Sequence, residues 1–229
     1  MPILKDWDLA LDADKVLWGQ GADPAGVRAR RPKLVAEAEK VIEQGRPLLN
    51  PIVLYQRFPV IELRHEQLLL AGGALLGPLI SRHLAAASEV IVAICTVGEG
   101  ASKNSDEQFQ ANPVLAFALE GLAAAAAQAL GEAACRYFEA AAAAEGLRTS
   151  IPLNPGMIGW PLEEGQKQIF SLMDASAIGV TLGPGCIMQP LKSVSLVIGL
   201  GRDLDGNGQS CDFCSMRNTC HYRNHAHAG

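Results

Sequence analysis

The chain has 229 residues, of which 49% are hydrophobic and 19% are charged, and its formal net charge is −5. A chain of this length and apolar content can bury a substantial core, so the composition excludes a disordered protein, a collagen-like repeat and a coiled coil. The acidic balance and the low aromatic content of 5% argue against a nucleic-acid partner, because such proteins usually present a basic face or aromatic stacking platforms.

The N-terminus does not have the pattern of a secretory signal. Its first fifteen residues include four aspartates, whereas a signal peptide needs a basic start and an unbroken apolar stretch. The Ala-rich stretch 121–130 is interrupted by Gln128 and is too short to cross a bilayer. We therefore expect a cytoplasmic protein with no membrane partner.

The first half of the chain predicts a mixture of helices and one strand. Residues 1–20 are typical of an arm or a docking strand, and Asp23 followed by Pro24 can begin a helix. Apolar residues at helical spacing predict an amphipathic helix over 32–44. Residues 51–63 alternate like a strand broken by Pro59, and the apolar stretch 65–84 predicts a helix.

The second half predicts α+β organisation. The β-branched run 89–96 predicts a buried strand, the polar residues 101–111 a loop, and the Ala-rich stretch 113–145 a long helix. Beyond it we expect a short strand, a loop, a helix and three short strands, at 148–153, 154–160, 161–173, 178–182, 186–189 and 193–199. Strands that follow helices without regular alternation favour an α+β domain over a doubly wound sheet. We assign this domain to residues 1–200 and a Cys-rich tail to 201–229.

The tail carries a candidate metal site. Cys211, Cys214 and Cys220 form a C-x2-C-x5-C pattern, and clustered thiols in a reducing compartment indicate a metal. Zinc and iron–sulfur sites usually have four protein ligands, so the trio is one short. An iron–sulfur cluster, a structural zinc and metal-free thiols all remain open. The candidates for a fourth ligand are His221, His225, His227, Cys186 and Cys95.

Common catalytic motifs are missing from the sequence. It contains no GxGxxG after a strand, no P-loop and no G-x-S-x-G elbow, and no Ser/His/Asp set stands out. These absences leave no support for a kinase, a hydrolase or a dinucleotide-dependent enzyme.

The segment 148–199 resembles the activation domain of vitamin B12-dependent methionine synthase, and still more its short stand-alone relatives. The resemblance extends more loosely over about residues 30–200. The residues that carry it are Pro155, Gly156, Trp160, Pro161, Leu162, Gln166, Phe170, Ile178, Gly179, Val180, Met188, Pro190, Lys192, Ser193, Val194 and Ser195. It implies a single domain with a twisted antiparallel sheet flanked by helices. It also implies a shallow groove that faces a corrinoid, where the enzyme's domain binds S-adenosylmethionine while the cobalt is reduced and methylated.

This sequence departs from the family at the sulfonium-binding stretch, Arg-x-x-Pro-Gly-Tyr. Pro152, Pro155, Gly156 and Met157 occupy those positions, so the arginine and the aromatic ring are both replaced. Loss of a charge-assisted contact to a substrate carboxylate removes about 1.5–3 kcal/mol. We therefore expect no tight binding of S-adenosylmethionine.

The resemblance and the cysteines together suggest an accessory redox protein. In this hypothesis a cluster of the 4Fe-4S type on the Cys trio reduces the cobalt of a corrinoid, held by a corrinoid protein or a corrinoid-dependent methyltransferase. The alternatives are a non-redox docking module with structural zinc, or an enzyme that uses the groove for another small molecule. The candidate cofactor-binding residues are Pro155, Gly156, Met157, Trp160, Met188, Lys192 and Ser193. Trp160 and Met188 would contact a flat ring, with core packing as the alternative. Lys192 would meet a corrin amide or phosphate, with a solvated charge as the alternative.

Overall fold

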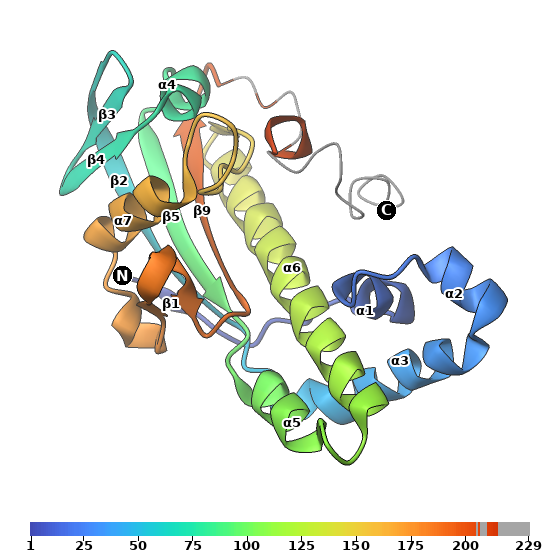
Figure 1. Ribbon diagram of the computed structural model, residues 1–229. Helices are drawn as coiled ribbons and strands as arrows, with labels where there is room; N and C mark the ends of the chain where they lie inside the picture. Colours follow the sequence, from blue (N-terminus) through green and yellow to red (C-terminus); the bar gives the residue numbers. More distant parts are fainter. Residues whose placement is uncertain (205, 207–209, 215–229) are drawn as a thin grey trace.

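The computed structural model describes residues 1–204, 206 and 210–214. Its centre is an antiparallel sheet with strand order β4-β3-β2-β5-β9-β6 (Figure 1). In addition, β1 pairs with the first residues of β2. These strands are β1 (Ile3–Leu4), β2 (Ile52–Arg64), β3 (Gln67–Leu70), β4 (Gly73–Leu76), β5 (Glu89–Thr96), β6 (Arg148–Thr149) and β9 (Ser193–Gly201). A separate short ribbon joins β7 (Thr181–Leu182) to β8 (Met188–Gln189).

Helices cover both faces of this sheet. They are α1 (Ala13–Gly19), α2 (Pro24–Arg30), α3 (Pro32–Gly45), α4 (Pro78–Leu84), α5 (Gly100–Gln108), α6 (Pro113–Ala144) and α7 (Leu162–Leu172). Short 3-10 turns complete the described chain at η1 (Arg46–Leu48), η2 (Ala175–Ile178), η3 (Pro184–Cys186) and η4 (Ser210–Phe213). The α+β architecture with a sheet flanked by helices is therefore as the sequence predicts.

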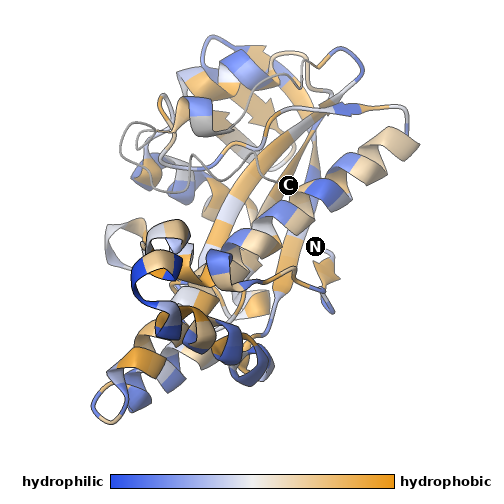
Figure 2. Cartoon of the chain, turned by 90° about the vertical axis from the view of Figure 1, so that its right-hand side faces the viewer, coloured by the Kyte–Doolittle hydropathy of each residue, from blue (hydrophilic) through white to orange (hydrophobic). Residues whose placement is uncertain are grey.

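The central strands are apolar on both faces because each face is covered. Along β5, Val90, Val92 and Ile94 point into a core shared with α4 and α7. Their neighbours Ile91 and Ala93 point into a second core against α6, as strand alternation requires. Figure 2 shows the hydrophobic colour running along these strands.

Helix α6 is the main element of the second face. By length and composition it could cross a membrane, since its most apolar window has a mean hydropathy of 1.6. However, 67% of that window is buried within the structure, as in the core helix of a soluble protein. Its N-terminal half also packs on α1 and α3, which together form a third apolar cluster. The long helix therefore joins the sheet to a helical lobe.

Three expectations from the sequence are wrong. The strand over 51–63 is not broken at Pro59, because β2 runs through that residue while still paired with β5. The stretch 65–84 is not one helix but β3, β4 and α4, because Gly72 and Gly77 take positive φ values of 115° and 145° and turn the chain. The buried residues Leu68 and Leu70 follow the two-residue period of a strand.

The polar stretch 101–111 is mostly helical, as α5, rather than a loop. Helix α5 shows no apolar pattern in the sequence because the face that it buries is narrow and consists of small side chains. Only Ala101 and Ser105, one helical turn apart, are buried in this helix, and Ser105 Oγ donates a hydrogen bond to the Ala116 carbonyl of α6 at 2.8 Å. The N-terminal arm does dock a strand, β1, but it also contains α1.

Candidate functional site

The loop between β6 and α7 carries most of the predicted site residues, and it is fastened along β9. Leu153 and Val197 exchange two backbone hydrogen bonds of 2.9 Å. One step further, Asn154 Nδ2 donates to the Ser195 carbonyl at 2.9 Å. Pro155 and Gly156 follow directly, so this part of the loop is held close to β9 by the bonds of Leu153 and Asn154.

The side chains of Met157, Trp160 and Met188 lie in the core. Trp160 is fully buried, and its Nε1 donates to Gln168 Oε1 at 3.1 Å. Met157 and Met188 belong to the same apolar cluster, and Met157 Sδ accepts from the Asn154 N–H at 3.0 Å. None of the three presents an open surface to a planar ligand here. Their burial matches the core-packing alternative.

Lys192 and Ser193 stand at the start of β9 and have protein partners. Lys192 Nζ lies 2.9 Å from Glu120 Oε2 on α6. Burial would raise the pKa of the Glu120 carboxyl, but hydrogen bonds from Ser102 and Lys192 outweigh it and lower the pKa. Ser193 Oγ lies 2.9 Å from Thr96 Oγ1, at the end of the neighbouring strand β5. Lys192 is thus an ion-paired residue rather than a freely solvated charge.

Residues 210–214 lie against the site loop, which the sequence did not predict. The Ile158 N–H donates to the Phe213 carbonyl at 2.8 Å, and Met157 forms an antiparallel bridge with Cys214. The Phe213 ring meets the His83 ring edge-on at 4.6 Å, and Arg82 Cζ lies 5.4 Å from the Phe213 ring centroid. Phe213 therefore anchors the described end of the tail between α4 and the loop.

This anchor brings one cysteine of the predicted metal site beside the predicted cofactor-binding stretch. Cys214 is a half-buried free thiol. Cys220, the candidate histidines His221, His225 and His227, and the side chain of Cys211 lie outside the described residues. Within the described residues there is no group of three His, Cys, Asp or Glu side chains that could hold a metal ion. The metal site itself stays a prediction.

Exposed apolar side chains surround the same segments. Ile158, Leu162, Ile187 and Leu191 are between 44% and 63% exposed. They come from the site loop, the start of α7 and the two turns that flank β8. Exposed apolar surface of this kind often marks a binding face. The residues predicted from the sequence, such as Met157, Trp160 and Met188, are the buried neighbours of these exposed ones.

The fold and this loop define a class of α+β domain: an antiparallel sheet, a long helix on one face, and a loop hydrogen-bonded along the inner strand β9. A solved structure of this class is the MetH reactivation domain bound to AdoHcy. It superposes with a TM-score of 0.62 over 93% of this chain and 82% of its own, at 16% sequence identity. The expected fold is therefore confirmed. No family model and no curated protein matches the sequence.

Proposed function

We propose that this chain is a cytoplasmic accessory protein that binds a corrinoid, or the protein that carries it, and helps to reduce the cobalt. The observation that carries this proposal is the backbone pairing of Cys214 with Met157, on a fold shared with the MetH reactivation domain. That pairing sets a thiol of the C-x2-C-x5-C pattern at the loop where the family resemblance expects the cofactor.

The exposed apolar residues Ile158, Leu162 and Leu191 supply the surface for a flat, largely apolar macrocycle or its carrier. Trp160 and Met157 support that surface from beneath by packing, rather than by direct contact. The Lys192–Glu120 ion pair fixes the turn at the start of β9. In this proposal the exposed residues contact the ligand, and the buried residues beneath them hold the loop in place.

Cys211, Cys214 and Cys220 would hold an iron–sulfur cluster, with a fourth ligand still to be identified. When bound, such a cluster would supply single electrons, taken from an external low-potential donor, for the reduction of Co(II) to Co(I), within the range of potentials these clusters reach. The chain's own task is positioning. Phe213 holds the cysteine segment against the loop through Ile158, Arg82 and His83.

We expect S-adenosylmethionine and AdoHcy to bind weakly or not at all. Pro152 replaces the arginine that the family places there, and Met157, in place of the aromatic residue, is buried in the core. The site therefore offers neither the carboxylate clamp nor the open ring. Calorimetric titration with AdoHcy should show no saturable binding up to millimolar concentration.

The first test is anaerobic purification followed by iron, zinc and acid-labile sulfide analysis, with visible and EPR spectra. The proposal expects about four irons with matching sulfide, and a protein-dependent reduction of Co(II) cobalamin to Co(I), measured as the rate above that given by the donor, titanium(III) citrate, alone. Cys214→Ser should abolish the cluster signal and this reduction while the far-UV spectrum stays unchanged. The matched control is Cys135→Ala, a thiol on α6 outside the tail, which should keep both. Full reduction activity in Cys214→Ser would overturn the redox role.

A second candidate function is a docking module with structural zinc. The observation that favours it is the Phe213 anchor, because a metal-clipped tail folded onto α4 would brace the loop without electron transfer. One zinc per chain, no iron, and binding of a corrinoid protein that survives oxidation would select this function over the redox one.

A further inference from the structure

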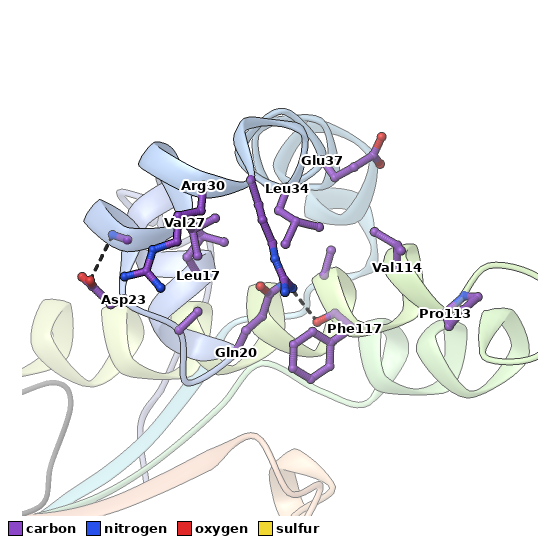
Figure 3. Close-up of a pocket in the computed structure, with 14 residues that line it drawn as sticks. Leu17, Gln20, Asp23, Val27, Arg30, Leu34, Glu37, Pro113, Val114 and Phe117 are labelled. Atoms are coloured by element: carbon purple, nitrogen blue, oxygen red, sulfur yellow. Dashed lines mark hydrogen bonds between the residues drawn. The ribbon is translucent and has the colours of Figure 1, made fainter.

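A groove lies in the helical lobe, formed by elements other than the site loop. Helices α1, α2, α3 and the first turns of α6 enclose a volume of about 630 Å³ (Figure 3). Sites for small molecules and cofactors usually measure about 300–1,000 Å³. The groove is therefore of the right size for a small ligand.

The walls of this groove are mostly apolar and include an exposed aromatic ring. Leu17, Val27 and Leu34 line it from three different helices, and Phe117 contributes from α6. Phe117 remains 57% exposed, although it stands beside the buried cluster of this lobe. A ring left open in a concave, apolar setting can take the flat face of a ligand.

The rim of the groove carries two guanidinium groups without a carboxylate partner among the described residues. Arg28 of α2 is ion-paired to Asp14, whereas none of the residues that the structure describes forms an ion pair with Arg30 or Arg31. Two carboxylates also line the groove. Asp23 accepts from the backbone N–H groups of Ala25 and Gly26 and so serves its own helix start, and Glu37 belongs to α3. Guanidinium groups bind carboxylate and phosphate oxygens and also stack on aromatic faces.

We propose that this groove binds a small anionic ligand with a planar apolar body, such as an aromatic carboxylate or phosphate. The body lies against Phe117 and Leu34, and the anionic group meets Arg30 and Arg31. Binding at this place is independent of the corrinoid function, because no residue of the 150–161 loop lines the groove.

The test uses a matched pair of fluorescent probes with the full-length protein. 8-Anilinonaphthalene-1-sulfonate carries the anion and the planar body, and N-phenyl-1-naphthylamine carries the same body without charge. The wild type should bind the sulfonate at one saturable site, more tightly than the neutral probe. In the double variant Arg30→Gln/Arg31→Gln the sulfonate should bind about tenfold more weakly, while the neutral probe changes less than about twofold.

Two controls separate the groove from other surfaces. Arg28→Gln lies on the same helix but outside the lining, and Ile158→Ser lies on the exposed apolar face of the site loop; neither should change sulfonate binding. Phe117→Ala should weaken both probes. Should the double variant fail to fold, raising the salt concentration on the wild type must weaken the sulfonate and spare the neutral probe. Equal binding of the sulfonate in wild type and double variant, no saturable binding to the wild type, or loss on Ile158→Ser would overturn the proposal.

Discussion

At the scale of single residues, Trp160 shows how a family-typical side chain can serve packing. Its ring is fully buried, and Nε1 donates to Gln168 Oε1, which also accepts from the Leu76 N–H. Trp160→Ala should lower the free energy of unfolding by about 3–5 kcal/mol, because it leaves a large cavity. Urea denaturation measures this loss. An unchanged unfolding curve combined with lost corrinoid binding would instead indicate a direct ring contact.

His83 gives a residue-scale pH dependence. Burial and, to a smaller extent, the charge of Arg82 lower the pKa of His83, whose ring meets the Phe213 ring edge-on. Because the folded pKa is below the unfolded value of about 6.5, its contribution is complete above that pH and is lost as the pH falls. Protection of the Ile158 amide from hydrogen exchange, corrected for intrinsic rates, should decline below about pH 6.5. His83→Gln should remove this decline, and a decline that persists in the variant would exclude His83 as its source.

At the scale of elements, the crossing of α1 and α6 depends on two glycines. A Cβ added to Gly19 would lie 2.2 Å from the Gly121 carbonyl oxygen, which is backbone and cannot move aside. Gly19→Ala should therefore destabilise the helical lobe, with a lower midpoint in thermal unfolding. The matched control is Gly131→Ala in α6, where the atom nearest to an added Cβ is Val194 Cγ1 at 3.9 Å. That change should raise stability by about 0.5–1 kcal/mol, since alanine favours the helix. Equal effects of the two substitutions would contradict the close crossing.

The tail anchor is a second element-scale feature. Phe213→Ala removes the ring that packs on His83 and Arg82, so η4 should detach from the site loop. Trypsin should then cut at Arg202 or within the tail faster than in the wild type. Phe109→Ala, at an exposed ring just after α5, should leave the cleavage rate unchanged. An unaltered rate in Phe213→Ala would mean that the backbone bond from Ile158 alone holds the segment.

Some helices and strands could be predicted from the sequence pattern, and others could not. The strand 89–96 and the helix 113–145 were found because their composition and period agree with their burial. In the stretch 65–84 the leucines are dense enough to hide the strand period, and the positive φ values of Gly72 and Gly77, which turn the chain between its elements, are visible only in the structure. The pairing of Met157 with Cys214 could not be predicted, since it depends on the whole sheet placing α4 and the loop together.

At the scale of the whole molecule, the two-sided covering of the sheet buries thiols that are far apart in the sequence. Cys95 on β5 and Cys135 on α6 both pack in the core between the sheet and the long helix. Burial raises the pKa of Cys135 to about 12, with smaller contributions from Glu139 and Glu132. Burial also raises the pKa of Cys95, and Cys135 adds to that shift. The fold therefore suppresses the thiolate form at both positions.

Brief iodoacetamide treatment of the folded protein at pH 8 should accordingly leave Cys95 and Cys135 unmodified, because the thiolate is the reactive species and is scarce at both. The same treatment in concentrated urea should alkylate both, and mass spectrometry of tryptic peptides distinguishes the two conditions. Labelling of Cys135 at the rate of an exposed thiol in the folded protein would contradict the packing of α6 on the sheet. Cys186 is buried as well, so occupancy of the predicted trio is read only from the peptides that carry Cys211, Cys214 and Cys220.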